Sequence, residues 1–341
     1  MRRMIINQRE LLERITRSIV VEGKKFVNPE FIETNSSLIV LTGDKALKIL
    51  KEKKNKQYSD LQSRFTWLYE EMRINSEITP KLYLNIRPIF LHHDQVIVGN
   101  DNNDLDSIVE YGLCMKRLKQ ASLVHNMLLN GTYSSKHSII IARRIADFHI
   151  SKLSGGLSQD DQILMQKFSS LATLKKVIKN DFETFEKRKA NFVPTAITEF
   201  KYQRIKRYIF KFLEENENLL KERVSRGYVV PIHGDFHSTN IFVEGGSVYA
   251  IDRALSRNLR VNDIIKDPAY LSVDLETFGF EQEMECLLNT YQERVKDPCF
   301  EKLLPFYVCR LAFVKGIVSF SSGNQFQLKP YFDLAYKYAK Q

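Results

Sequence analysis

Residues 231–252 read Pro-Ile-His233-Gly234-Asp235-Phe-His237-Ser-Thr-Asn240-Ile-Phe-Val-Glu-Gly245-Gly246-Ser-Val-Tyr-Ala-Ile-Asp252. Runs of apolar, β-branched and aromatic residues flank the Gly-Gly pair, which is the signal of a β-hairpin with a two-residue turn. Folding the chain there brings Asn240 and Asp252 to the same open end, within about one residue of cross-strand register. An amide oxygen and a carboxylate side by side suit a hard cation such as Mg²⁺. The stretch therefore predicts a metal site at the end of a hairpin.

A further carboxylate precedes this hairpin. Asp235 lies before Asn240 at the separation that kinases use between two catalytic-loop residues. In kinases the first is the aspartate that accepts a hydroxyl proton, and the second is the asparagine that binds the metal. We expect Asp235 to position a nucleophile and Asp252 to hold the metal. The alternative is that His233-Gly234-Asp235 forms an ordinary turn and that Asp252 caps a strand.

This spaced set resembles the motifs of the aminoglycoside phosphotransferase and choline kinase-like family, a branch of the protein-kinase fold. The shared features are His-Gly-Asp, five residues ending in Asn, a hairpin, and then Ile-Asp. The resemblance implies an enzyme that uses ATP and Mg²⁺ to phosphorylate a hydroxyl group. It also implies that Asp235 is the catalytic residue and that Asn240 and Asp252 are the metal ligands.

The chain resembles a poorly characterised bacterial subgroup of this family. The resemblance covers nearly the whole chain, with its segments in the same order. It includes residues 33–49, 70–83, 110–118, 145–149, 259–276 and 306–316. There are two departures. Asn35 stands where the subgroup tends to carry His, and Arg253-Ala-Leu-Ser-Arg257 replaces an acidic, aromatic stretch after the metal aspartate. The second departure bears on the acceptor more than on the chemistry.

The fold class implied by the resemblance is α+β, as a bilobal protein-kinase-like fold. Residues 1–117 are expected to form a nucleotide-binding N-lobe with a small antiparallel sheet and one main helix. Residues 118–341 are expected to form a larger, mostly helical C-lobe that carries the catalytic and substrate-binding residues.

A kinase-like site also needs a lysine for the nucleotide phosphates and an acidic partner for it. Residues 36–42 and 45–50 flank Gly43-Asp44 and predict a second hairpin. Lys48 shares a face of the second strand with Ala46 and Leu50, so its ammonium needs a partner or must point to water at a sheet edge. On a helix predicted over 58–78, Glu71 projects at the edge of the apolar stripe and Glu70 on the opposite side. We expect Glu71 to pair with Lys48, mainly on the strength of the resemblance, and Glu70 to be solvated.

Two further segments are candidates for nucleotide contacts. Residues 33–37 include Asn35, Ser36 and Ser37, whose backbone amides and side chains could cover phosphates. A plain polar turn is the alternative. Residues 115–118 end the strand predicted over 109–118, and we expect the backbone near Met115 and Arg117 to lie where kinases bind adenine.

The remaining pattern is strand-rich and then helix-rich. We expect a leading helix over residues 1–25 and strands over 82–90 and 95–99. Helices are predicted over residues 139–153, 160–187 and 196–224. His149 is expected to support the catalytic loop by packing. Asp263 and Asp267 are expected to brace the loop, with a helical salt-bridge pair as the alternative.

Composition limits the class of protein to which the chain can belong. The chain has 341 residues, a net charge of +10 and four cysteines without CxxC spacing. No apolar run approaches the length of a membrane span and no secretory signal is visible, so the sequence predicts a cytoplasmic protein with reduced cysteines and no membrane partner.

The favoured hypothesis is a phosphotransferase with a small-molecule hydroxyl acceptor. Basic clusters at residues 51–56, 175–176 and 201–211 leave open an alternative in which the same chemistry acts on a nucleic acid or a protein. A basic exterior is the reverse of what a polycationic antibiotic would require. The third reading is a nucleotide-binding module without catalysis.

Overall fold

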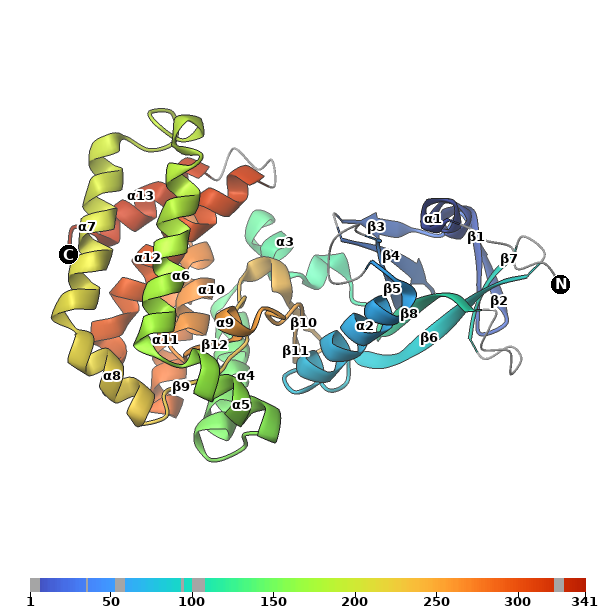
Figure 1. Cartoon of the computed structure of the whole chain (residues 1–341), viewed down its shortest axis with the longest axis horizontal. Helices are drawn as coiled ribbons and strands as arrows, with labels where there is room; N and C mark the ends of the chain where they lie inside the picture. Colours follow the sequence, from blue (N-terminus) through green and yellow to red (C-terminus); the bar gives the residue numbers. More distant parts are fainter. Residues whose placement is uncertain (1–6, 35, 53–58, 93–94, 100–107, 322–327) are drawn as a thin grey trace. The chain divides into compact units, whose positions relative to one another are not determined.

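The structure is a computed structural model, and it describes residues 7–34, 36–52, 59–92, 95–99, 108–321 and 328–341 (Figure 1). The chain divides into two compact units, Met1–Lys119 and Gln120–Gln341. The first contains a sheet with two helices and the second is mostly helical, so the predicted α+β class is confirmed.

Unit 1 is built on an eight-stranded sheet with the order β2-β1-β7-β6-β8-β5-β4-β3. Neighbouring strands are antiparallel except β1 and β7, which are parallel. The strands are β1 (Ser18–Val21), β2 (Lys24–Val27), β3 (Phe31–Glu33), β4 (Ser37–Thr42), β5 (Lys45–Leu50), β6 (Tyr83–His92), β7 (Gln95–Val98) and β8 (Ile108–Lys116).

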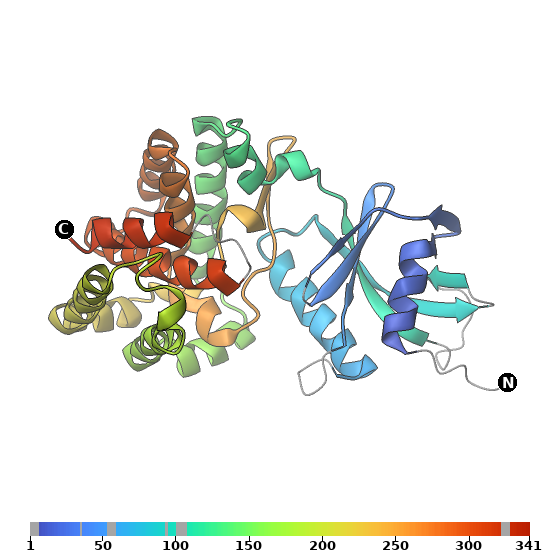
Figure 2. The same cartoon turned by 90° about the horizontal axis from the view of Figure 1, so that it is seen from above.

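Helices α1 (Gln8–Arg17) and α2 (Leu61–Ser76) lie on opposite sides of these strands (Figure 2). Leu47 and Ile49 of β5 join the core that contains Leu11 and Ile15 of α1. Because side chains alternate along a strand, Lys48 must point to the other face, where α2 packs on β8 and β6.

The expectation of a leading helix over residues 1–25 was wrong at its C-terminal end. Helix α1 ends at Arg17, and the chain then forms the β1–β2 hairpin. Ile19, Val20 and Val21 favour a strand because they are β-branched. Glu22 and Gly23 make the two-residue turn, both with positive φ (51° and 77°).

Unit 2 is an assembly of helices with two short β-ribbons (Figure 1). The helices are α3 (Val124–Leu129), α4 (Ser135–Leu153), α5 (Gln159–Phe168), α6 (Leu171–Glu186), α7 (Glu199–Glu215), α8 (Glu217–Ser225), α9 (Arg257–Arg260), α10 (Lys266–Thr277), α11 (Glu281–Val295), α12 (Phe300–Ser321) and α13 (Leu328–Tyr338). The ribbons pair β9 (Val229–Pro231) with β12 (Val261–Asp263), and β10 (Ile241–Glu244) with β11 (Ser247–Ala250).

The helices predicted over 160–187 and 196–224 are each interrupted. The Ser170 hydroxyl accepts from the Thr173 backbone N–H and so begins α6, while Asn216 separates α7 from α8. Serine favours a helix start because its side chain satisfies an unpaired N–H group, whereas the Asn216 side-chain amide donates to the Phe212 carbonyl at the end of α7, at 3.0 Å. The apolar periodicity alone did not reveal these boundaries.

Helix α10 is buried on all sides, from Lys266 to Glu276. Four of its buried residues are acidic or basic: Lys266, Asp267, Asp274 and Glu276. Buried charges need partners, and Lys266, Asp267 and Asp274 each have one in the loop that follows β9.

The four cysteines form no disulfide. Among the helices in the described part of the chain, none combines the length and the apolar character needed to cross a membrane.

Candidate active site

Lys48 and Glu71 form an ion pair inside unit 1. The Lys48 Nζ and a Glu71 carboxylate oxygen are 2.6 Å apart, and the two side chains are only 12% and 4% exposed. Glu70 instead pairs with Arg73 at the helix surface. The predicted pairing is present, and α2 holds the lysine from the side of the sheet opposite α1.

The segment between β3 and β4 is a tight turn around Thr34. The Thr34 hydroxyl oxygen accepts from the backbone N–H groups of Ser37 and Ser36, at 3.0 and 3.3 Å. Ser37 is buried at the start of β4. Both amides therefore have an acceptor within the turn. Asn35 lies outside the described residues.

Met115 and Arg117, the residues expected near the adenine, lie at the end of β8 and just after it. Met115 pairs with Ala46 of β5. The Arg117 N–H donates to the Asp44 carbonyl at 2.8 Å, and its guanidinium donates to Glu30 at 2.6 Å. Arg117 is thus held against the β4–β5 turn.

In unit 2, the loop after β9 holds Asp235 from two directions. The Asn240 side-chain nitrogen donates to the Asp235 carboxylate at 3.1 Å and to its carbonyl at 3.0 Å. The His237 Nε2 lies 3.3 Å from the other carboxylate oxygen. Burial raises the pKa of the Asp235 carboxyl, but the hydrogen bond and charge of His237 outweigh it and leave the pKa below its ordinary value. Because its pKa is lowered, the Asp235 carboxyl is ionised at neutral pH. Its side chain is 42% exposed, so the carboxylate is accessible.

The β10–β11 hairpin brings Asn240 and Asp252 to one end, as its Gly-Gly turn predicts. Ile241 lies opposite Ala250, and the Ile251 N–H donates to the Asn240 carbonyl at 2.9 Å. Asp252 follows immediately, exposed, with a φ of 53°. A left-handed conformation at a residue other than glycine stores strain, and such strain gathers at functional sites.

These two residues fit a magnesium ion. Asn240 uses its side-chain nitrogen on Asp235, which leaves the amide oxygen as the atom for a cation, and Asp252 adds a carboxylate. No three His, Cys, Asp or Glu residues gather as a metal site in the described ranges. Two protein oxygens suit Mg²⁺, because it takes its remaining ligands from phosphates and water.

Asp267 at the start of α10 fixes the loop backbone. Its carboxylate accepts from the N–H groups of His233 and Gly234 at 2.7 and 2.9 Å, and it lies 3.1 Å from the His149 Nε2. His149 also contacts the Tyr291 hydroxyl at 2.7 Å. All of these groups are buried. Asp267 and His149 thus brace the loop, whereas Asp263 pairs with Arg223 instead.

Gly234 is required by the path of this loop. Its φ is 82°, and a Cβ there would lie 2.7 Å from the Leu259 carbonyl oxygen. The Lys266 ammonium donates to the Gly234 carbonyl at 2.8 Å. Burial lowers the pKa of Lys266 to about 8. The tight packing at Gly234 and the Lys266 hydrogen bond to its carbonyl therefore fix the backbone next to Asp235.

Several residues near the loop were given no role from the sequence, although Asp274, Arg310 and Lys315 lie in segments that carry the resemblance: Asp181, Tyr270, Asp274, Arg310 and Lys315. Arg310 and Lys315 are buried charges in the apolar part of helix α12 that follows its first turn. A charge inside an apolar helix must have a partner, and this was the available signal. The partners, Asp181 and Asp274, are far away in sequence.

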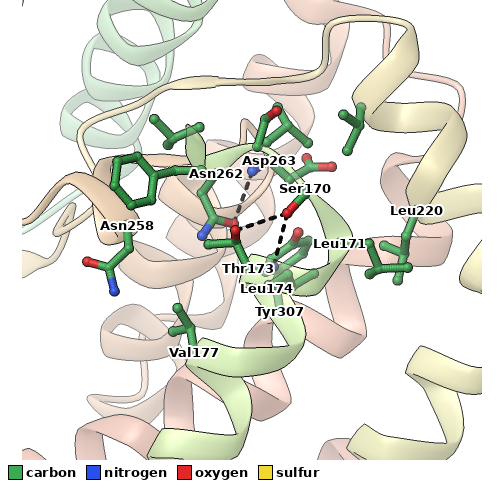
Figure 3. Close-up of a pocket in the computed structure, with 15 residues that line it drawn as sticks. Ser170, Leu171, Thr173, Leu174, Val177, Leu220, Asn258, Asn262, Asp263 and Tyr307 are labelled. Atoms are coloured by element: carbon green, nitrogen blue, oxygen red, sulfur yellow. Dashed lines mark hydrogen bonds between the residues drawn. The ribbon is translucent and has the colours of Figure 1, made fainter. Parts of the chain in front are cut away.

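One cavity lies elsewhere in unit 2, between α6, α8 and β12 (Figure 3). Its walls include Leu171, Val177, Leu220 and Tyr307, with Ser170 and Thr173 hydrogen-bonded at its rim. Its volume of about 20 Å³ holds roughly one water molecule, since each needs at least about 10–15 Å³. It is a packing defect and not a substrate site.

No family model matches the chain. Relatives in Mycobacterium tuberculosis and Mycobacterium bovis, both described as uncharacterised proteins, are 24% identical over 311 residues. The match covers 86% of this chain and 55% of the relatives. The chain thus spans about half the length of the curated relatives it matches.

Solved structures resemble the whole chain. A choline kinase from Cryptosporidium parvum superposes with a TM-score of 0.55 at 13% identity, covering 98% of this chain and 94% of the kinase. The GDP complex of a mutant aminoglycoside 2′-phosphotransferase-IIIa gives a TM-score of 0.54 at 13% identity, covering 98% of both chains. The chain therefore has the fold shared by choline kinases and aminoglycoside phosphotransferases.

Proposed function

We propose that this protein is an ATP- and Mg²⁺-dependent phosphotransferase that phosphorylates a hydroxyl group of a small molecule. The observation that supports this best is the arrangement of Asp235, Asn240 and Asp252 around the β10–β11 hairpin. The Asp235 carboxylate is partly exposed, Asn240 contacts it, and the hairpin register brings Asn240 and Asp252, the two proposed oxygen ligands, to one end. The Lys48–Glu71 pair supplies the cation that a triphosphate needs.

In the proposed reaction, Asp235 orients the acceptor hydroxyl and takes its proton. The hydroxyl oxygen forms a bond to the γ-phosphorus while the bond between that phosphorus and the β–γ bridging oxygen breaks, which releases ADP. Lys48 offsets phosphate charge, and Asn240 and Asp252 would hold the metal ion. Bound Mg²⁺ would neutralise charge on the phosphates. The proposal requires that these residues of the two units face one nucleotide.

The remaining nucleotide contacts belong to the same proposal. Asn35 and Ser36 would approach the phosphates, with Ser37 shaping the turn behind them. The backbone near Met115 and Arg117 would contact the adenine.

The basic segments do not favour a macromolecular acceptor. Lys175 pairs with Glu217, Lys201 with Asp333 and Lys206 with Glu186. These pairs lower the charge that the segments offer to an acidic partner.

The direct test is a screen for phosphate transfer from ATP to metabolite hydroxyls in the presence of Mg²⁺. We expect transfer to at least one small acceptor and its loss when Mg²⁺ is chelated. Transfer only to protein or nucleic acid would contradict the small-molecule proposal. Binding of ATP without transfer or hydrolysis would favour a binding module.

Removing the charge of Glu71 should weaken nucleotide binding. Glu71→Gln removes the negative charge that pairs with the Lys48 ammonium, so the ammonium is held less firmly in position. A charge-assisted hydrogen bond contributes about 1.5–3 kcal/mol, so we expect MgATP affinity to fall by about 10- to 100-fold. The measurement is a calorimetric MgATP titration. The matched control is Glu70→Gln, which affects only the surface pair with Arg73. Equal effects of both substitutions would contradict the assignment.

Asp252→Gly should separate stability from metal binding. Glycine adopts a positive φ without strain, so the free energy of unfolding should rise by about 1 kcal/mol. The same change removes a metal ligand and should abolish the Mg²⁺ dependence of ATP binding. Lys296→Gly is the control, since Lys296 has a φ of 54° at the end of α11. It should stabilise the protein similarly and leave Mg²⁺ dependence intact. Retained Mg²⁺ dependence in Asp252→Gly would exclude Asp252 as a ligand.

A further inference from the structure

The ammonium of Lys315 is enclosed by aromatic rings and a carboxylate. Its Nζ lies 5.3 Å from the ring centroid of Tyr270 and 5.2 Å from that of Tyr331. It is also hydrogen-bonded to Asp274, which is fully buried. Aromatic faces combined with a negative charge are what proteins use to bind alkylammonium ligands. Here the chain's own lysine fills such a cage.

The cage lies beside the proposed catalytic loop. Asp274 accepts from the Ser238 N–H and from the Tyr331 hydroxyl, both at 2.9 Å. The His237 ring packs against Tyr270 with centroids 5.1 Å apart. Because His237 also lies 3.3 Å from the Asp235 carboxylate, the path from Lys315 to the proposed base crosses only Tyr270 and His237.

A second ion pair belongs to the same region. On α12, Arg310 donates twice to one carboxylate oxygen of Asp181, at 2.7 and 3.1 Å. Its Nη1 is buried and has no hydrogen-bond partner in the part of the chain that the structure describes. The Asp181 side chain is 20% exposed. Burial raises the pKa of the Tyr270 hydroxyl well above its ordinary value; Asp235, Asp274 and Asp181 add to this rise, and Arg310 opposes it.

We propose that Lys315 occupies the ammonium site beside Asp235 and thereby restricts the acceptor to neutral polyhydroxyl compounds. This inference rests on the proposed phosphotransferase function. An amine acceptor would find the place of an ammonium, between the two tyrosine rings and Asp274, already filled by the Lys315 Nζ. An anionic acceptor would find Lys315 and Arg310 already neutralised by Asp274 and Asp181. A neutral polyol meets neither obstacle, because its hydroxyls carry no charge and can both donate and accept hydrogen bonds.

The cage is tested by removing the lysine side chain that fills it. Lys315→Ala removes the ammonium and leaves Asp274 between the two tyrosine rings. Tetramethylammonium carries no N–H group, so it binds only through charge and aromatic faces. We expect tetramethylammonium chloride to raise the melting temperature of Lys315→Ala saturably above that in sodium chloride of equal ionic strength. The wild type should not respond.

Lys152→Ala is the matched control variant. It also leaves a buried carboxylate, because Lys152 pairs with Asp161 at 2.7 Å. The ring of Phe148 lies near this ammonium, with its centroid 5.7 Å from the Lys152 Nζ. Tetramethylammonium should stabilise Lys315→Ala and not Lys152→Ala. Equal responses of the two variants, or none in Lys315→Ala, would overturn the cage.

The acceptor class is tested on the wild type, so this arm does not depend on the folding of a variant. Initial rates with MgATP are compared for neutral polyols (inositol, sorbitol, hexoses), amines (choline, ethanolamine, an aminoglycoside) and a hydroxy acid (glycerate). We expect kcat/KM for the best polyol to exceed that for every amine and acid by at least about tenfold. Preference for an amine or an acid would overturn the inference and leave the phosphotransferase proposal standing. Absence of transfer to every acceptor would overturn both, while the tetramethylammonium titration would still report on the cage.

Discussion

Asp235→Asn is expected to lower phosphate transfer by about 10²–10⁴-fold, the usual contribution of a positioned general base. The amide keeps the size of the side chain but cannot accept the hydroxyl proton. Nucleotide affinity should be nearly unchanged, because the proposed nucleotide contacts lie at Lys48, Asn240 and Asp252. The measurement is the single-turnover rate with the acceptor found in the screen, together with an MgATP titration.

The control for this substitution is Asp147→Asn, which breaks a pair between exposed side chains on α4 and α11. It should change neither the rate nor the affinity. If Asp235→Asn retained most of the wild-type rate, Asp235 would not be the base. If it failed to fold, as judged by its circular dichroism spectrum, the residue would be structural.

Of the substitutions considered, Asp267→Ala should lower the free energy of unfolding the most. The substitution removes the acceptor of two buried backbone N–H groups, those of His233 and Gly234, and of the neighbouring His149 ring. Buried donors without partners are unfavourable, and breaking a buried charged network typically costs about 3–5 kcal/mol. We expect the free energy of unfolding to fall by this amount in urea denaturation. Phosphate transfer should fall with it, because the loop that holds Asp235 loses its support.

Tyr291→Phe tests the same network at its edge. It removes one hydroxyl, which lies 2.7 Å from His149, and should lower the free energy of unfolding by only about 1 kcal/mol. A loss in Asp267→Ala as small as that in Tyr291→Phe would show that water or another group replaces the carboxylate. The bracing role of Asp267 would then be wrong.

Local turn chemistry explains why part of the site was predictable from the sequence. Gly245-Gly246 and Gly43-Asp44 each define a two-residue turn, and the register of a hairpin follows from its turn. That register places Asn240 near Asp252, and it places Lys48 on the face of β5 opposite Leu47 and Ile49. The pairing of Lys48 with Glu71 also required the resemblance, since the helix pattern alone leaves Glu71 at the margin of an apolar stripe.

The N-terminal strands were missed for a different reason. Residues 8–17 have strong helical periodicity, and extending it to residue 25 hid the Glu22-Gly23 turn. Strand β1 pairs in parallel with β7, far along the chain, and no local pattern specifies such a partner. The same holds for β3, which contributes only three residues, Phe31–Glu33, to the sheet edge.

The residues around Lys315 were beyond sequence reasoning because tertiary packing alone brings them together. The apolar run of α12 reads as a core helix, and its charges give no direction to a partner. Asp181, Tyr270 and Asp274 come from two other helices. Only the fold shows that Lys315 has two aromatic neighbours and a carboxylate.

Because α10 is buried on every side, it should not unfold locally while the rest of unit 2 stays folded. Amide protons of a fully enclosed helix exchange with deuterium only when the surrounding structure opens cooperatively. The carboxylates of Asp267 and Asp274, which hold the backbone of the loop at its two ends, are therefore anchored in a segment with few independent fluctuations. Local motions at the surface of unit 2 can change which molecules reach Asp235 without disturbing the geometry of the carboxylate itself.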